Sequence, residues 1–456
     1  MITETIISNA ANGEYTNQHY MKQLSSSPEF NTAYRDLEET YKKNYTDFAH
    51  KLRISMEAFA IAEETAKRME ASSAPLNINN VRRDATAYAK TQGYPNLLTA
   101  LSIARGNTAK IVAAILHINH ETSTTASDEN VILDFWIKLF AFGSKNSHAG
   151  TVSNFYIPNK NNCRDYLRKF TNIVFAYYGT DHTFSGKNLP FKDYYPIPQE
   201  ILDEHHIVLP KRKSICVRSE NNQNIIYLFS EQTSQSSNTE RREQETIQHL
   251  WTDNIEYPQN IINNAFFDSN DNHSDFCYWI YPLPTTPIAL SDDFIQELTL
   301  DERLFIIKGI IKGISSMHTA EPPYYHRNIS QYSFLIFRIG KKYKPILIDF
   351  AFTKDTSEDR AFTLFSDVVN LVNRTKSIYY APELYKLSRD AKDVDWGASD
   401  IYSLGILINK ILTNTTDTEA LPAEDPASCY YDIISNMTSP DMSERVSIKD
   451  VFDFFQ

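Results

Sequence analysis

The sequence has few cysteines and no long apolar run. Its 4 cysteines lie far apart in the chain, so neither a disulfide framework nor a cysteine-based metal site is expected. No run approaches the roughly 18 consecutive apolar residues that a membrane-spanning helix needs. The first residues, MITETIISNAANGEY, are acidic and polar where a secretory signal has a basic and then an apolar stretch. These absences predict free thiols, no membrane association and a cytoplasmic location.

Glycine and lysine are missing from a long internal stretch. The chain has 12 glycines in 456 residues, and none lies between Asn188 and Lys308. No lysine lies between Lys213 and Lys308. Glycine lets backbone N–H groups approach a phosphate closely, and a lysine ammonium group neutralises its charge. We therefore do not expect this stretch to hold a triphosphate in a glycine-rich cradle.

The charge is acidic and unevenly distributed. The formal net charge is −12 at pH 7. Residues 1–200 carry 21 Lys+Arg against 20 Asp+Glu, and residues 201–456 carry 24 against 37. An acidic surface repels nucleic acid. Protein partners, rather than nucleic acid, are therefore expected for the C-terminal half, and the composition does not indicate an oligomeric state.

The N-terminal part has the periodicity of helices. Residues 1–28 are polar and rich in serine and asparagine, which predicts a flexible arm. From about Phe30 to Ala71, apolar and aromatic residues recur at three- and four-residue spacings, which predicts one long helix or two in sequence. The prediction is an all-helical domain over 29–180 and a connector over 181–206, whose three prolines and aromatic residues favour an extended, packed segment. Its further helical patterns lie near 80–92, 95–104, 107–118, 128–142 and 162–179.

The pattern changes at about residue 207. Two short β-rich runs, 214–220 and 224–231, are separated by a polar turn, and a helical run follows. Two more β-rich runs come next, and helical patterns dominate after them. The fold class is therefore predicted as α+β. We expect an all-helical domain, then a β-rich lobe over 207–285 and a helical lobe over 286–456.

Three runs in the C-terminal half resemble parts of a known family. Residues 326–336 read HRNISQYSFLI, residues 347–351 read LIDFA, and residues 381–383 read APE. They resemble the catalytic loop, the metal-binding turn and the end of the activation segment of eukaryotic-type protein kinases. The resemblance covers about 207–456, and it implies a two-lobed kinase-like domain.

The catalytic loop departs from the family at the positions that do the chemistry. The family's general base is an aspartate, and Asn328 takes its place. An amide has no titratable carboxylate, so it cannot act as a base. The family's phosphate-stabilising lysine and metal-binding asparagine correspond to Ser330 and Ser333.

The smaller lobe lacks the family's strand lysine. Its place falls within residues 225–229, which read IIYLF, and Lys213 is expected to precede the first strand. Glu243 or Glu245 matches the helix glutamate and is expected to have no lysine partner. After Lys213, the cations of this lobe are three arginines: Arg218, Arg241 and Arg242.

The retained residues have mainly structural roles in the family. The resemblance assigns His326 and Phe350 to an internal hydrophobic spine, and Glu383 and Arg445 to a buried ion pair. It assigns Asp400 to the support of the catalytic loop, with a second role as helix N-cap. Arg327 and Asp349 are also retained, and Asp349 matches the metal-binding carboxylate.

These losses and retentions together favour a pseudokinase, a regulatory or scaffolding module that binds other proteins. No catalytic residue, cofactor or metal is then expected. One alternative is an enzyme with repurposed nucleotide chemistry, in which Asp349 supports weak binding of ATP and Mg²⁺.

A second alternative concerns the helical domain. Lys145, Asn146 and His148 lie in a loop between two expected helices. They faintly resemble the Arg-Asn…His motif of the HEPN family, whose helical bundles include ribonucleases. This alternative is an RNA-directed effector with His148 at its site.

Overall fold

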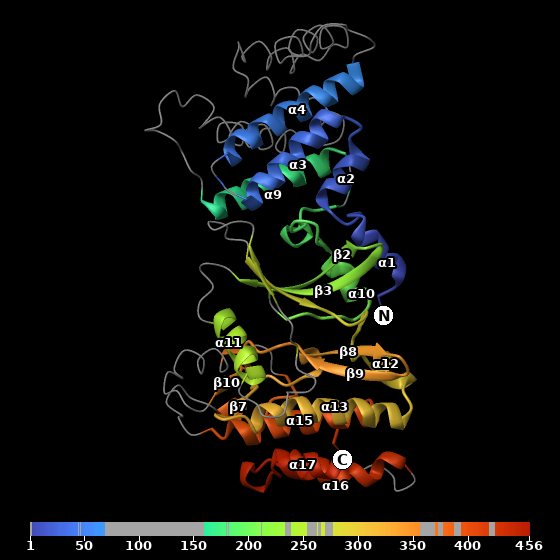
Figure 1. The fold of residues 1–456 in the computed structure, drawn as a ribbon, viewed down its shortest axis with the longest axis vertical. Coiled ribbons are helices and arrows are strands. Elements are labelled where there is room, and N and C mark those ends of the chain that lie inside the picture. The colour runs from blue at the N-terminus through green and yellow to red at the C-terminus, as the bar shows by residue number, and fades with distance from the viewer. Residues whose placement is uncertain are drawn as a thin grey trace, which may run out of the picture. The chain divides into compact units, whose positions relative to one another are not determined.

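The structure is a computed structural model of the chain (Figure 1). The chain divides into two compact units, each with most of its residue contacts inside it. The larger unit comprises Met1–Ser8, Ile197–Asp268 and Cys277–Gln456, and the helical unit comprises Asn9–Pro196 and Ser269–Phe276. The described residues are 2–43, 45, 47–68, 159–178, 180, 182–210, 212–232, 239–252, 262, 266–269, 277–355, 370–372, 377–386, 394–418 and 425–456.

The first residues form helices rather than the expected flexible arm. Helix α1 spans Glu4–Ala11 and helix α2 spans Asn17–Leu24. The side chain of Thr16 accepts a hydrogen bond from the backbone N–H of His19 and thereby caps α2. Met21 is buried. A capped helix with a buried apolar side chain corrects the prediction of a loose segment over 1–28.

The helical unit is built on three longer helices. These are α3 (Pro28–Lys43), α4 (Phe48–Arg68) and α9 (Lys160–Tyr177). The expected helical pattern after Phe30 is thus two helices in sequence, and the pattern near 162–179 is α9. The other expected helices of this domain lie outside the described residues.

Aromatic side chains form the core between these helices. Phe30, Tyr34, Phe59 and Phe170 are all buried, and the ring centroids of Phe30 and Phe59 lie 5.0 Å apart. The Tyr34 hydroxyl lies 2.8 Å from the hydroxyl of Thr171, so its polar end is paired. Fully buried aromatic rings contribute strongly to a core. The periodic aromatic residues are therefore core residues, as their spacing predicts.

The larger unit begins with a sheet. Strands β2 (Lys213–Glu220) and β3 (Gln223–Gln232) form an antiparallel hairpin, and Asn221 and Asn222 at its turn have φ of 49° and 65°. Asparagine tolerates this left-handed region, which two-residue hairpin turns need. Strands β2, β3, β5 (Cys277–Pro282) and β4 (Phe266–Ser269) lie in that order, and α11 (Thr239–Thr252) follows β3.

Helices and a second sheet make up the rest of this unit. Strands β6 (Pro287–Ile288), β8 (Phe334–Ile339) and β9 (Lys342–Leu347) lie in that order, and α13 packs against β9 (Figure 1). The long helices are α13 (Leu300–His318) and α15 (Trp396–Thr413). The shorter elements are α10 (Gln199–Glu204), α12 (Asp292–Glu297), β7 (Tyr324–Tyr325), β10 (Lys354–Asp355), α16 (Tyr431–Met437) and α17 (Ile448–Phe455).

The boundary of the larger unit differs from the predicted one. Apart from Met1–Ser8, the unit begins at Ile197, before the expected residue 207. Helix α10 lies within the segment expected to be an extended connector, and Leu202 of this helix is buried. The three prolines near this helix suggested extended backbone, but Pro198 stands just before the helix, where proline is compatible with a helix start.

Within the described ranges, no helix combines the length and the hydropathy that crossing a bilayer takes.

Candidate functional site

The loop that contains residues 326–328 is held by Asp400 of α15. The two carboxylate oxygens of Asp400 accept hydrogen bonds from the backbone N–H groups of His326 at 2.7 Å and Arg327 at 2.8 Å. The His318 ring donates to the same carboxylate at 3.1 Å. Asp400 is only 1% exposed, so these donors replace the water that a buried carboxylate lacks. Arg327 has a φ of 66°, and the two bonds to Asp400 hold this uncommon conformation.

The ring of His326 connects this loop to the turn after β9. Its Nε2 atom donates to the backbone carbonyl of Asp349 at 2.5 Å, and its Nδ1 atom accepts from the backbone N–H of Asn328 at 3.2 Å. The rings of His326 and Phe350 lie 6.2 Å apart, and both residues are buried. The ring therefore acts as a fixed structural bridge.

Asn328 occupies the position of the family's general base. Its amide nitrogen donates to Oδ2 of Asp349 at 3.2 Å, and its amide oxygen accepts from the Tyr380 hydroxyl at 2.9 Å. The partner carboxylate can only accept, which fixes the orientation of the amide. Asn328 therefore has no basic atom to offer to a substrate hydroxyl, and its oxygen already has a donor.

The two serines of this loop build the loop itself. The Ser333 hydroxyl donates to the carbonyl of Asn328 at 2.8 Å and accepts from the backbone N–H of Ser330 at 3.2 Å. The Ser330 hydroxyl accepts from the backbone N–H of Tyr332 at 3.3 Å. Ser333 is 1% exposed. Its hydroxyl is thus already engaged where the family has a metal ligand.

We expect Asn328→Asp to destabilise the protein in a pH-dependent way. The new carboxylate would lie next to that of Asp349, and repulsion raises the pKa of one of the two. A carboxyl group whose pKa is raised in the folded state lowers the free energy of unfolding as pH rises. The loss is about 1.4 kcal/mol for each tenfold change in the acid dissociation constant of the group. Urea denaturation should therefore show a larger loss at pH 7.5 than at pH 4. The loss in Asn328→Ala should be similar at both pH values, and equal pH profiles for the two variants would contradict the prediction.

The structure places a lysine beside the helix glutamate, which corrects the sequence prediction. Lys213 is the first residue of β2, rather than a residue before the strand, and it lies opposite Ser230 of β3. Its Nζ atom lies 2.7 Å from Oε1 of Glu243 on α11 and 3.4 Å from the hydroxyl of Ser230. The Lys213 and Glu243 side chains are 3% and 5% exposed. The prediction that Glu243 has no lysine partner is therefore wrong.

Glu243 also reaches the turn that follows β9. The same carboxylate oxygen accepts a hydrogen bond from the backbone N–H of Phe350 at 3.2 Å. The neighbouring Asp349 accepts from the N–H of Ala351 at 3.2 Å and is 7% exposed. One buried carboxylate, that of Glu243, thus joins helix α11 to the turn after β9.

A cavity of about 590 Å³ adjoins these residues. Its lining includes Ser230, Glu243, Asn328, Ser330 and Asp349. Cavities that hold small molecules have volumes of roughly 300–1,000 Å³. The cavity is therefore large enough for a small molecule.

The donor set does not suit a metal held by the protein alone. Asp349 supplies one carboxylate, and the Ser333 hydroxyl is already engaged. Magnesium prefers six oxygen ligands in octahedral geometry. No group of three or more His, Cys, Asp or Glu side chains in the described part of the chain is arranged to hold a metal ion. The expected absence of a metal stays a prediction.

The ion pair expected between Glu383 and Arg445 is present. The two guanidinium nitrogens of Arg445 donate to the two carboxylate oxygens of Glu383 at 2.7 and 2.9 Å, and Ser399 donates to the same carboxylate at 2.7 Å. Burial raises the pKa of Glu383, but the hydrogen bonds from Arg445 and Ser399 outweigh it and hold the pKa below its usual value.

Asp400 is not the N-cap of its helix. The N-cap of α15 is Asp395, whose side chain accepts from the backbone N–H of Ala398 at 2.9 Å. Asp400 lies further along the helix and supports the loop instead. Arg327 lies beside the start of this helix, with its guanidinium 4.2 Å from the centre of the Trp396 ring.

The remaining candidate residues do not join this site among the described residues. Arg218 of β2 lies 3.3 Å from Glu220 and is about one-third exposed. The side chains of Arg241 and Arg242 are outside what the structure describes. Lys145, Asn146 and His148 also lie outside the described residues, so the HEPN-like site stays a prediction.

Comparison with known proteins gives a limited similarity. No model of a protein family matches the chain. The chain is 31% identical over 156 residues to a probable LRR receptor-like serine/threonine-protein kinase of Arabidopsis thaliana. The match covers 34% of this chain and 15% of that protein. This similarity supports a distant kinase-like relationship.

Proposed function

We propose that residues 197–456 form a catalytically impaired kinase-like module that regulates or assembles other proteins by binding them. The observation that carries this proposal is the position of Asn328. Its amide lies between the Asp349 carboxylate and the Tyr380 hydroxyl, where the family has an aspartate that acts as a base. Phosphoryl transfer depends on positioning and charge stabilisation. This loop has Asn328 in place of the family's base and Ser330 in place of its phosphate-stabilising lysine.

The contacts that hold the fold together support a role in binding. Asp400 fixes the loop, and Arg445 fixes Glu383. These contacts do not involve a substrate or a nucleotide. A partner that binds one arrangement of the two lobes more tightly than another would shift the population between them. Such a module transmits a signal without transferring a phosphoryl group.

We expect no phosphoryl transfer from the purified full-length protein. The assay is incubation with γ-labelled ATP and Mg²⁺, with autophosphorylation and a generic protein substrate as readouts. The Asp349→Ala variant serves as a background control. Transfer by the wild-type protein that disappears in Asp349→Ala would refute the proposed function, since contaminating kinases are insensitive to this substitution.

The Lys213–Glu243 pair favours a second candidate function, which is nucleotide binding with altered chemistry. Glu243, the buried partner of Lys213, lines the cavity of about 590 Å³ together with Asp349. A nucleotide, when bound, would supply the phosphates that Asp349 and a metal need for a complete site. Asp349 would hold that metal, and Lys213 would keep Glu243 in position at the edge of the cavity.

The two candidates differ in their response to ATP. With a regulatory module that binds no nucleotide, ATP and Mg²⁺ should leave the melting temperature of the wild-type protein unchanged. A ligand that binds the folded state at 100 times its Kd stabilises it by about 2.7 kcal/mol. A saturable rise in melting temperature that is lost in Asp349→Ala would instead favour the nucleotide-binding candidate.

A further inference from the structure

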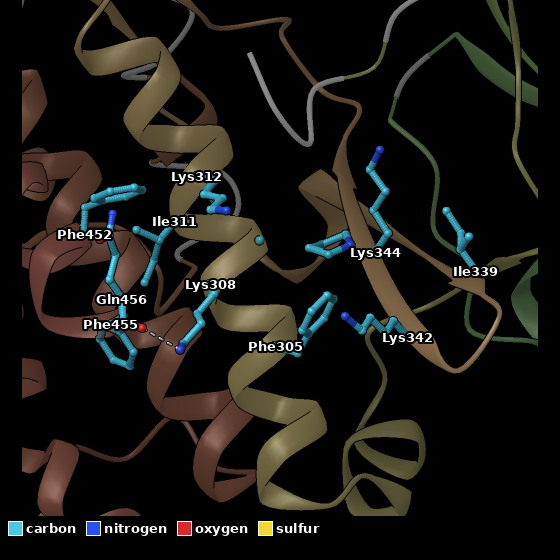
Figure 2. A pocket seen from close by; sticks show the side chains of 12 residues that line it. Phe305, Lys308, Ile311, Lys312, Ile339, Lys342, Lys344, Phe452, Phe455 and Gln456 are labelled. Carbon is cyan, nitrogen blue, oxygen red and sulfur yellow. Dashed lines mark hydrogen bonds between the residues drawn. The ribbon is translucent and has the colours of Figure 1, made fainter. Parts of the chain in front are cut away.

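A second cavity lies in the larger unit and shares no lining residue with the one at Asp349. It has a volume of about 720 Å³ and lies between α13, β9 and α17 (Figure 2). Neither the resemblance to kinases nor the proposed function makes use of these residues. The cavity therefore calls for a separate explanation.

Four lysines line this cavity. Lys308 and Lys312 lie on α13, and Lys342 and Lys344 lie on β9. All four side chains are exposed, and none of the described residues that line the cavity is acidic. Residues 201–456 as a whole carry 24 Lys+Arg against 37 Asp+Glu. The cavity is thus a basic patch on an otherwise acidic half of the chain, which attracts an anionic ligand.

Apolar side chains are exposed between the lysines. Phe305 is 41% exposed and Ile339 is 46% exposed, although both are large. The ammonium group of Lys342 lies 5.4 Å from the centre of the Phe305 ring. Exposed apolar side chains with a charged rim are typical of protein-interaction sites. The ligand that fits is therefore both anionic and partly apolar.

The lysines are spread over the cavity rather than gathered at one point. In Figure 2 their amino groups point in different directions, and Lys308 already donates to the backbone oxygen of Gln456 at 2.9 Å. A single phosphate group needs donors that converge on it, and this arrangement does not provide them.

The spacing of the lysines matches a peptide. Lys308 and Lys312 are one turn apart on a helix, or about 6 Å along its axis. Lys342 and Lys344 are about 6.8 Å apart along a strand. In an extended peptide, side chains on the same face repeat at the same distance of about 6.8 Å. The backbone spacing within each pair of lysines thus matches carboxylates that recur along one acidic segment.

We propose that this cavity binds an acidic peptide segment of a partner protein, with a phenylalanine or leucine between its carboxylates. The carboxylates pair with the lysines of α13 and β9, and the apolar side chain contacts Phe305 and Ile339. A nucleic acid is disfavoured because residues 201–456 are acidic overall, which repels a long phosphate backbone. The proposal rests on the proposed function in naming a protein partner, and it gives that partner's chemistry and its docking surface.

The test measures binding of a defined peptide to the full-length protein. The probe is a fluorescein-labelled peptide with two central phenylalanines flanked on each side by three glutamates, and fluorescence anisotropy reports its binding. We expect saturable binding that weakens as salt is raised. Lys312→Glu with Lys344→Glu should weaken binding roughly tenfold, which is about 1.4 kcal/mol, because two surface ion pairs are lost and two repulsions are added.

The matched control has the same change of charge at lysines that do not line the cavity. Lys22 and Lys386 are exposed and lie on elements that do not border it, so Lys22→Glu with Lys386→Glu should leave the affinity within about twofold. Phe305→Ser should weaken binding of the peptide that contains phenylalanine. It should have little effect on binding of a control peptide in which serines replace the two phenylalanines. Urea denaturation of each variant checks that it is folded.

Several results would overturn the proposal. One is the absence of saturable binding at low salt, and another is equal binding by the two charge-reversed doubles. A third is binding of a single-stranded RNA or of phosphatidylserine vesicles through the same lysines without binding of the peptide. The radiolabel assay is independent of all of these. Phosphoryl transfer would remove the proposed function and leave the peptide result intact, and loss of the peptide result alone would remove only this docking surface.

Discussion

Arg445→Ala is expected to lower the free energy of unfolding of the larger unit by about 3 kcal/mol at pH 7, because it leaves the partly buried Glu383 carboxylate without its cation. The guanidinium group of Arg445 is 0% exposed and makes two bonds to Glu383. The measurement is urea denaturation followed by tryptophan fluorescence. Trp251, Trp279 and Trp396 lie in this unit, so the signal reports mainly on it.

Arg338→Ala is the matched control for Arg445→Ala. Arg338 is also an arginine of the larger unit, but it is exposed, so its loss should change stability by no more than about 0.5 kcal/mol. A similar small loss in Arg445→Ala would show that the pair is not buried in solution.

The same pair predicts a sensitivity to acid. The pKa of Glu383 is held below its usual value of 4.5, mainly by Arg445, against the effect of burial. A lowered folded-state pKa stabilises the protein above pH 4.5, and this stability is lost as pH falls through the lowered pKa. The difference between wild type and Arg445→Ala should therefore shrink below pH 4.5. A constant difference down to pH 3 would argue against an ionised Glu383.

Most helices and strands of the described chain follow from local patterns in the sequence. The apolar and aromatic repeat after Phe30 predicts the two helices α3 and α4, and the paired β-rich runs predict β2 and β3. Helix α2 is different because its sequence is polar. Its stability depends on the Thr16 cap and on burial of Met21, and burial by distant residues is not visible in a local pattern.

The Lys213–Glu243 pair shows why part of the site escaped prediction. The resemblance places the lysine on the strand before the helix, within residues 225–229, where this chain has only apolar and aromatic residues. The two-residue turn at Asn221 and Asn222 sets the register of the hairpin, and this register places Lys213 opposite Ser230. The position of the turn and the number of residues between it and Lys213 therefore encode the pairing in the sequence. The lysine of the pair lies on the neighbouring strand β2 rather than on the expected strand β3.

Lys213→Met is expected to lower the free energy of unfolding by about 3–5 kcal/mol, because it leaves the Glu243 carboxylate buried without its cation. Both side chains are at most 5% exposed, and Glu243 also holds the backbone of Phe350. The substitution therefore weakens both the α11 contact and the turn at Asp349. The measurement is again urea denaturation followed by tryptophan fluorescence. Arg218→Met removes a cation from the same strand β2, but Arg218 forms only a partly exposed pair with Glu220, so its loss should cost no more than about 1 kcal/mol.

The double variant Lys213→Met with Glu243→Gln separates the loss of the ion pair from the loss of packing. The glutamine carbonyl still accepts from the N–H of Phe350, and no unpaired charge remains buried. The double variant should therefore be more stable than Lys213→Met, with a coupling free energy of about 1–3 kcal/mol between the two positions. If Lys213→Met costs no more than Arg218→Met, or if the coupling is zero, the two residues do not form a buried pair. The smaller lobe would then lack a positioned lysine, and the nucleotide-binding candidate would lose the observation that favours it.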